Sequence, residues 1–182
     1  MTNKYQEHLW VLPEDDANRQ LVNGFRTSLD LDDRRIQVLP PARGWENVLG
    51  AMKRHQSDLA TCPHRHLLLM IDFDTKVDDR AKRFLKDRSK LLPGVQDRVY
   101  LLGSRGTPEQ LRKALEMSFE RIGAKLAVDC PPDAAAGIWQ HADLRHNANE
   151  LARLVAKVRP FLFKRGATVA PQTSTLALKV AT

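Results

Sequence analysis

HLLLMIDFD, residues 66–74, is the stretch of this sequence that decides the fold. Five apolar residues in succession, 67–71, are followed by Asp72 and Asp74, which are separated by a single residue. A continuous apolar run of this length predicts a strand that is buried on both faces, as in a parallel sheet. The two carboxyl groups then lie at the carboxyl end of the strand, which is the edge where open α/β sheets bind ligands.

Two interpretations of this acidic strand end stay open. Neighbouring carboxylates repel each other, and a divalent cation such as Mg²⁺, which prefers oxygen ligands, relieves the repulsion. Aspartate is also common in solvated turns, and in that case the pair holds no ligand. The rest of the sequence has to decide between a metal site and a plain turn.

A second acidic segment follows the first apolar run of the chain. Residues 9–12 lead through Pro13 into Glu14, Asp15 and Asp16. If both apolar runs form central parallel strands, Glu14 faces the same edge as the two later aspartates. Three carboxyl groups could then hold one Mg²⁺, or leave one of them as a proton donor or acceptor. The alternative is that Asp15 and Asp16 cap the following helix, which leaves Glu14 available for catalysis.

The composition is that of a globular protein with an excess of positive charge. The chain has 182 residues, of which 42% are hydrophobic and 28% charged, and its formal net charge is +7. The length predicts one domain with a core of ordinary size. No apolar run reaches membrane-spanning length, the N-terminal segment lacks the shape of a signal peptide, and two distant cysteines do not indicate a disulfide framework. We therefore expect a cytoplasmic protein without membrane contact.

The positive charge is concentrated in the later parts of the chain. Residues 1–40 carry five basic and seven acidic side chains, residues 41–140 carry seventeen and thirteen, and residues 141–182 carry seven and two. An acidic site in a basic protein is the pattern expected where carboxylates hold a metal beside a polyanion and basic groups neutralise its phosphates. The pattern favours DNA or RNA as the partner, with solubility as the alternative explanation. A protein partner or a homodimer also stays open.

Strand-like and helix-like segments alternate through the first 105 residues. Strands are expected at about 8–12, 35–39, 67–71 and 98–102, and helices at about 16–29, 45–59 and 78–91, the last of them exposed. Such alternation predicts a parallel sheet with right-handed crossovers. The expected fold class is α/β, with a Rossmann-like, four-stranded, mainly parallel sheet and helices on both faces.

A strong helix start follows the fourth expected strand. Thr107 is a typical N-cap, Pro108 suits the first helical position, and Gln110 completes a capping box. We expect this helix to run to Ile122, with Gly123 as its C-terminal stop.

The chain is expected to end in a second helix and a tail. An amphipathic pattern predicts a long helix over 142–158, ended by Pro160. The expected organisation is an α/β core over residues 1–106, a helical extension packed on it over 107–163, and a tail over 164–182.

Two turns after expected strands carry an arginine. Arg43 follows the second strand in an Arg-Gly-Trp turn, and Arg105 follows the fourth in a Gly-Ser-Arg-Gly turn. Both turns lie near the acidic edge, so the two arginines are candidate phosphate ligands. Neither segment matches a nucleotide-binding fingerprint, and plain turns are the alternative. His141 and His146 flank the expected start of the long helix, where a solvated helix start is favoured over a role at the site.

The order of these features resembles the Toprim domain of bacterial primases, topoisomerases and OLD-type nucleases. A glutamate after the first strand, a glycine-containing turn after the second and Asp-x-Asp after the third span about residues 8–105. The resemblance implies a Toprim-like fold and metal-dependent phosphodiester chemistry on nucleic acid. It also implies that Glu14 is the general acid or base and that Asp72 and Asp74 bind Mg²⁺ or Mn²⁺.

The sequence departs from the Toprim pattern at two positions. Asp15 stands where the family usually has glycine, and Asn18 stands where an acidic residue often follows the glutamate. Neither an ATPase nor a zinc-finger segment accompanies the motifs, so the resemblance implies a small standalone protein. The departures bear on catalytic competence more than on the fold.

Two other functions stay open. Mg²⁺-dependent phosphatases of the haloacid dehalogenase type also place Asp-x-Asp after a buried strand, and Leu101-Leu102-Gly103-Ser104 could imitate their second motif. That family, however, expects Thr or Val where this chain has Lys76, and its first motif normally lies near the N-terminus. The third interpretation is a non-catalytic basic α/β module that binds nucleic acid or protein, with acidic residues that serve only as helix caps.

Overall fold

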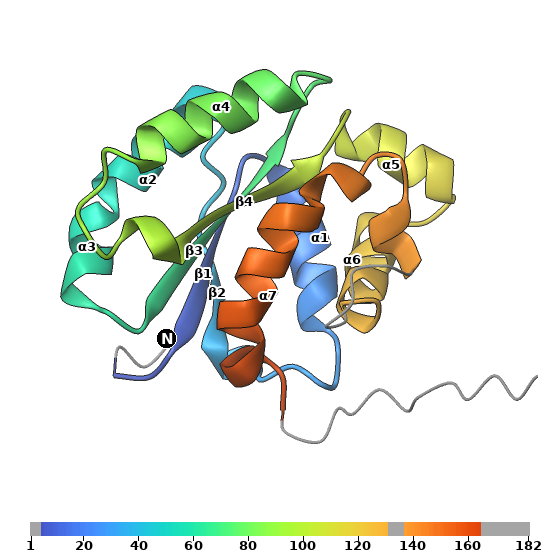
Figure 1. The fold of residues 1–182 in the computed structure, drawn as a ribbon. Helices are drawn as coiled ribbons and strands as arrows, with labels where there is room; N and C mark the ends of the chain where they lie inside the picture. The colour runs from blue at the N-terminus through green and yellow to red at the C-terminus, as the bar shows by residue number, and fades with distance from the viewer. Residues whose placement is uncertain (1–4, 131–136, 165–182) are drawn as a thin grey trace, which may run out of the picture.

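In the computed structural model, which describes residues 5–130 and 137–164, four strands form one sheet (Figure 1). The strands are β1 (His8–Pro13), β2 (Ile36–Val38), β3 (Arg65–Asp72) and β4 (Val99–Ser104). Their order across the sheet is β2-β1-β3-β4, and every adjacent pair is parallel. The predicted four-stranded α/β fold is confirmed, and the described sheet is wholly parallel.

Helices cover both faces of the sheet, as the sequence predicts (Figure 1). One face carries α2 (Trp45–Arg54), α3 (Gln56–Thr61) and α4 (Val77–Arg88). The other face carries α1 (Asp16–Arg26), α5 (Pro108–Leu115), α6 (Phe119–Val128) and α7 (Ala148–Leu162). Among the described residues, no helix has both the length and the apolar character needed to cross a membrane.

The apolar run that predicts β3 supplies side chains to both faces of the sheet. Leu67, Leu69 and Ile71 are fully buried in the cluster beneath α2 and α4, whereas Leu68 belongs to the cluster beneath α1, α6 and α7. Successive residues of a strand point to opposite faces. A strand with helices on both sides therefore needs the uninterrupted apolar sequence that this one has.

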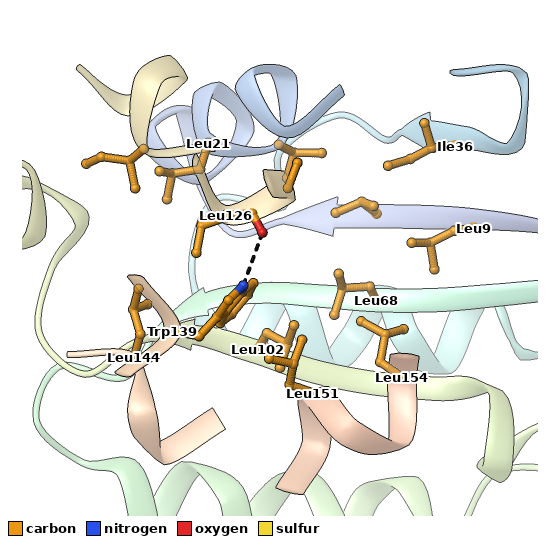
Figure 2. Packing of buried hydrophobic residues seen from close by; sticks show 14 of the residues in the cluster. Leu9, Leu21, Ile36, Leu68, Leu102, Leu126, Trp139, Leu144, Leu151 and Leu154 are labelled. Carbon is orange, nitrogen blue, oxygen red and sulfur yellow. Dashed lines mark hydrogen bonds between the residues drawn. The ribbon is translucent and has the colours of Figure 1, made fainter. Parts of the chain in front are cut away.

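Figure 2 shows the cluster on the second face, where the last third of the chain packs against the sheet. Leu9, Leu68 and Leu102 come from three neighbouring strands, and Leu151 and Leu154 of α7 pack on them. The indole of Trp139 is also buried there and donates a hydrogen bond to the Leu126 carbonyl at 3.1 Å. The helices after β4 and the sheet thus share one apolar cluster.

The helix expected over 108–122 is two helices. The predicted capping box between Thr107 and Gln110 is present at the start of α5. The helix ends at Leu115 because Glu116 adopts a left-handed conformation with φ 51°. Ser118 then caps α6 by accepting a hydrogen bond from a backbone N–H of its first turn.

The sequence suggested that Gly123 ends a helix. In the structure Gly123 lies inside α6, at a close crossing with α1. A Cβ atom on Gly123 would stand 2.0 Å from the Leu21 carbonyl oxygen, and one on Gly24 would stand 2.1 Å from the Glu120 carbonyl oxygen. The two glycines therefore let the backbones of α1 and α6 touch. A glycine that permits this contact has the same sequence signature as one that ends a helix.

The helices near the N-terminus are shorter than expected. The helix expected over 16–29 ends at Arg26, and the one expected over 45–59 is divided at His55 into α2 and α3. The helix expected to be exposed, α4, buries Phe84 in the core.

The long helix expected over 142–158 is displaced toward the C-terminus. A 3₁₀ turn, Arg145–Asn147, precedes it, so α7 begins only at Ala148. Pro160 does not end α7, because it lies in the last turn and removes only one hydrogen-bond donor, while Leu162 beyond it is buried on the core. The expected tail lies, apart from its first residue, outside the described residues.

We expect Gly123→Ala to lower the free energy of unfolding by about 1–3 kcal/mol, because the added methyl group forces α1 and α6 apart. Gly50→Ala is the matched control. A Cβ there meets only the flexible end of Arg54, at 3.2 Å, so alanine should be neutral or stabilising by about 0.5–1 kcal/mol. Denaturant titrations measure both, and equal effects would contradict the backbone contact.

Candidate functional site

Glu14 and Asp72 meet at the carboxyl edge of the sheet. Glu14 directly follows β1 and Asp72 ends β3, and these two strands are parallel neighbours. The backbone N–H of Glu14 donates to the Met70 carbonyl at 2.7 Å, and Glu14 Oε2 accepts a hydrogen bond from the backbone N–H of Asp72 at 3.0 Å. The two bonds fix the Glu14 carboxylate over the end of β3.

Asp74 lies in the turn that follows β3. Asp74 and Thr75 have φ values of 47° and 63°, a left-handed conformation that is uncommon for residues other than glycine. The backbone N–H of Thr75 donates to the Arg105 carbonyl at 2.7 Å, and that of Arg105 donates to the Asp143 carbonyl at 2.9 Å. The turn is therefore tied to the turn after β4 and, through it, to the segment before α7.

Asn18 connects α1 to the carboxylate of Asp72. Its Nδ2 donates to Asp72 Oδ1 at 2.9 Å and to Asp15 Oδ1 at 3.1 Å. Asp15 is the N-cap of α1, since the same oxygen accepts the backbone N–H of Asn18 at 2.9 Å. The Asn18 side chain is buried, and its Oδ1 has no partner among the described residues. Asp15 therefore has the capping role that the sequence allowed, and Asn18 orients Asp72.

Arg80, which the sequence patterns did not single out, lies between the carboxylates of Asp74 and Glu14 and against the backbone of Asp72. Its Nη2 contacts Asp74 Oδ2, its Nη1 donates to the backbone carbonyl of Asp72, and Nη1 lies 3.8 Å from Glu14 Oε2. The side chains of Arg80 and Glu14 are only 14% and 13% exposed. The one sequence signal for Arg80 was its place at the start of the helix after Asp-x-Asp, which many basic residues share.

Burial raises the pKa of two carboxyl groups at this edge. The pKa of Asp72 is raised from its ordinary value of 3.8 to about 7, mainly by burial, and the charges of Asp15, Glu14 and Asp74 add to the effect while the Asn18 hydrogen bond opposes it. Burial also raises the pKa of Glu14, against the hydrogen bond from the Asp72 backbone. Carboxyl groups with raised pKa values that gather at a ligand-binding edge are typical of functional sites.

Arg43 borders an open groove beside Glu14. The groove has a volume of about 630 Å³ and is lined by Glu14, Asp15, Asp16, Arg19, Pro40, Pro41, Arg43 and Gly44. The backbone N–H of Arg43 donates to the Glu14 carbonyl at 2.7 Å. The turn containing Arg43 is thus held against the acidic edge, where the sequence predicts it.

Arg105 borders a second recess, on the side of β4. This recess has a volume of about 320 Å³ and is lined by residues 75–79, Arg105 and His146. The His146 ring packs edge-on against Phe73, and its two nitrogens have no partner among the described residues. Burial and the charge of Arg105 lower the pKa of His146. His146 is therefore close to the acidic edge, whereas His141 accepts a hydrogen bond from the Asp143 backbone through Nδ1.

The donor groups at this edge suit Mg²⁺ or Mn²⁺ in type. Glu14, Asp72 and Asp74 offer carboxylate oxygens, which hard divalent cations prefer, and a cation would relieve the repulsion among them. Within the part of the chain that the structure describes, however, no three histidine, cysteine or acidic side chains are arranged so that they could hold a metal ion. The guanidinium of Arg80 lies between the carboxyl groups instead.

Comparison of the chain with protein-family models, curated proteins and solved structures finds no match. The fold and the site define an α/β protein with a buried acidic centre at the carboxyl edge of a parallel sheet. The resemblance to Toprim domains stays a prediction based on the order of the acidic and glycine-containing segments.

We expect Asp72→Asn to stabilise the metal-free protein at pH 8. The pKa of Asp72 is higher in the folded than in the unfolded state, so the folded state is fully favoured below pH 4 and loses stability as the pH rises through 7. The full shift corresponds to about 4 kcal/mol, which solvent screening of this partly exposed group reduces to about 1–2 kcal/mol.

Denaturant titrations at pH 8 and pH 4 test this expectation. Asparagine keeps an oxygen that accepts the hydrogen bond from Asn18, so the variant differs mainly in charge. Its advantage should be present at pH 8 and absent at pH 4. An advantage of equal size at both pH values would mean that ionisation of Asp72 is not its cause.

Proposed function

We propose that this protein carries out Mg²⁺- or Mn²⁺-dependent phosphodiester chemistry on nucleic acid. The observation that carries the proposal is the meeting of Glu14 with Asp72 and its neighbour Asp74 at the ligand-binding edge of a parallel sheet, between two hollows that are each bordered by an arginine. The Toprim resemblance and the basic excess of residues 41–182 support the same function.

The proposed roles follow from the position and charge of each side chain. Asp72 and Asp74 would hold the metal, which would supply stabilisation of negative charge on the scissile phosphate. Glu14 would be the general acid or base, because burial raises the pKa of its carboxyl group above the ordinary value, and such a shift is typical of carboxyl groups that transfer protons in catalysis. Asn18 keeps the Asp72 carboxylate directed at the centre through its hydrogen bond.

The strand order provides a path for a phosphate backbone. Across the sheet, Arg43, Glu14, Asp72 and Arg105 lie at the carboxyl ends of β2, β1, β3 and β4, in that spatial order. Adjacent strands lie about 4.8 Å apart, so the two arginine turns are separated by roughly 14 Å, the rise of about four phosphates along one strand of a duplex. A strand bound along this edge would contact an arginine on each side of the carboxyl groups.

A non-catalytic nucleic-acid-binding module is the second candidate function. The observation that favours it is the position of Arg80, whose guanidinium already neutralises the carboxyl groups. In this case the arginines of the edge bind phosphates, and the acidic centre only supports the fold.

Cleavage assays separate the two functions. We expect nicking or cleavage of plasmid or single-stranded substrates with Mg²⁺ or Mn²⁺, and a loss of about 10²-fold or more in Glu14→Gln, because a positioned general acid or base contributes at least that factor. Glu46→Gln is the control, since the Glu46 side chain is 73% exposed and belongs to a surface ion pair with Arg83. If neither metal supports cleavage, the catalytic part of the proposal is wrong.

The salt dependence of binding tests the nucleic-acid part. Each phosphate contact releases counterions, so Arg43→Ala and Arg105→Ala should each weaken binding and reduce the slope of log K against log salt by about one. Arg34→Ala is the control, because Arg34 is exposed and precedes β2, at the opposite edge of the sheet. Filter binding at several salt concentrations measures the slopes. Affinity that does not change with salt would leave a protein-binding role as the better explanation.

A further inference from the structure

Arg80 lies between two of the three carboxyl groups, those of Glu14 and Asp74, where a metal ion bound by both would have to lie. One end of its guanidinium contacts the Asp74 carboxylate, and the other contacts the Asp72 carbonyl and lies 3.8 Å from Glu14 Oε2. Opposite charges at such short distances in a partly buried site attract strongly. A divalent cation that bound Glu14, Asp72 and Asp74 together would meet the guanidinium at contact distance and be repelled by it.

In this same position the Arg80 guanidinium also lies near an aromatic ring. Its guanidinium carbon already lies 5.6 Å from the ring centre of Trp45, the first residue of α2, and arginine is attracted to the face of an aromatic ring. Trp45 follows the Arg43–Gly44 turn that borders the groove beside Glu14. Arg80 therefore lies close both to the carboxyl groups and to the residue that follows the turn bordering this groove.

We propose that Arg80 is a built-in counter-ion that competes with the divalent cation for Glu14, Asp72 and Asp74, and that it moves onto a substrate phosphate when the metal binds. The inference rests on the proposed function, and it adds a regulatory step to that site. The metal displaces Arg80 from the carboxyl groups, and a phosphate of the nucleic acid binds the displaced guanidinium. Each ligand therefore tightens the binding of the other by the same factor. Metal binding to the wild-type protein is thus weaker in the absence of the substrate than in its presence.

Titration of the protein with Mn²⁺, followed by calorimetry, tests the competition without reference to activity. We expect Arg80→Gln to bind Mn²⁺ about tenfold more tightly than the wild-type protein, and Arg80→Lys, which keeps the charge but loses the planar fork, to fall between them. Arg83→Gln is the matched control on the same helix, because Arg83 pairs with Asp87 and Glu46 instead; it should leave the affinity unchanged. Adding Asp72→Asn to Arg80→Gln should remove the gain.

A second titration tests the coupling. A single-stranded oligonucleotide should tighten Mn²⁺ binding to the wild-type protein severalfold and should have little effect on Arg80→Gln, in which the competing charge is already gone. Melting temperatures of the metal-free variants verify that each variant is folded. If Arg80→Gln does not fold, the comparison of Arg80→Lys with the wild-type protein provides the test. Equal or weaker Mn²⁺ binding by the folded Arg80 variants, or no binding by any of them, would overturn the inference.

These outcomes are distinguishable from failure of the proposed function. If Arg80→Gln binds Mn²⁺ more tightly through Asp72 but no variant cleaves or binds nucleic acid, the competition by Arg80 stands and the function is wrong. If the wild-type protein cleaves DNA or RNA and Arg80→Gln gains no affinity for the metal, the function stands and Arg80 only orients the carboxylates.

Discussion

The parallel pairing of β1 with β3 is the interaction on which the rest of the structure depends. It pairs residues that lie 57 positions apart in sequence, in a register that runs from His8 with Arg65 to Pro13 with Met70. Because the strands are parallel, their carboxyl ends reach the same edge, and the ladder continues into the hydrogen bond between the Asp72 backbone and the Glu14 carboxylate. The helices then close both faces of a sheet whose centre is apolar on each side.

The sequence was informative where a single strand or turn carries the signal. The apolar run over residues 67–71 predicted a doubly covered strand, and the parallel order then placed Glu14 and Asp72 at one edge. Arg80 was not predictable in the same way, because its role depends on which direction one flexible side chain takes from α4. Gly123 was misassigned for a related reason: a glycine at a helix crossing is recognised only when the partner helix is in place.

The departure from the Toprim pattern at Asn18 has a physical meaning in this site. An acidic side chain at this position would add a fifth acidic group beside Glu14, Asp15, Asp72 and Asp74 and could not donate a hydrogen bond to ionised Asp72. Asn18 instead donates to Asp72 and Asp15 at once, which lowers the cost of keeping two carboxylates close together in a buried place. Where the Toprim pattern often has an acidic residue, this chain therefore has an amide that orients the Asp72 carboxylate.

Through the crossing of α1 and α6, the geometry of the acidic edge depends on residues that lie well outside it. Asn18 lies on α1, and the position of α1 is set by a backbone contact with α6 that tolerates no side chain at Gly24 or Gly123. The contact with α6 therefore helps to hold α1 in place, and with it the Asn18 side chain that reaches Asp72. In evolutionary terms, substitutions in α6 alone would shift Asn18 relative to Asp72, and so change the site, while every acidic residue stayed the same.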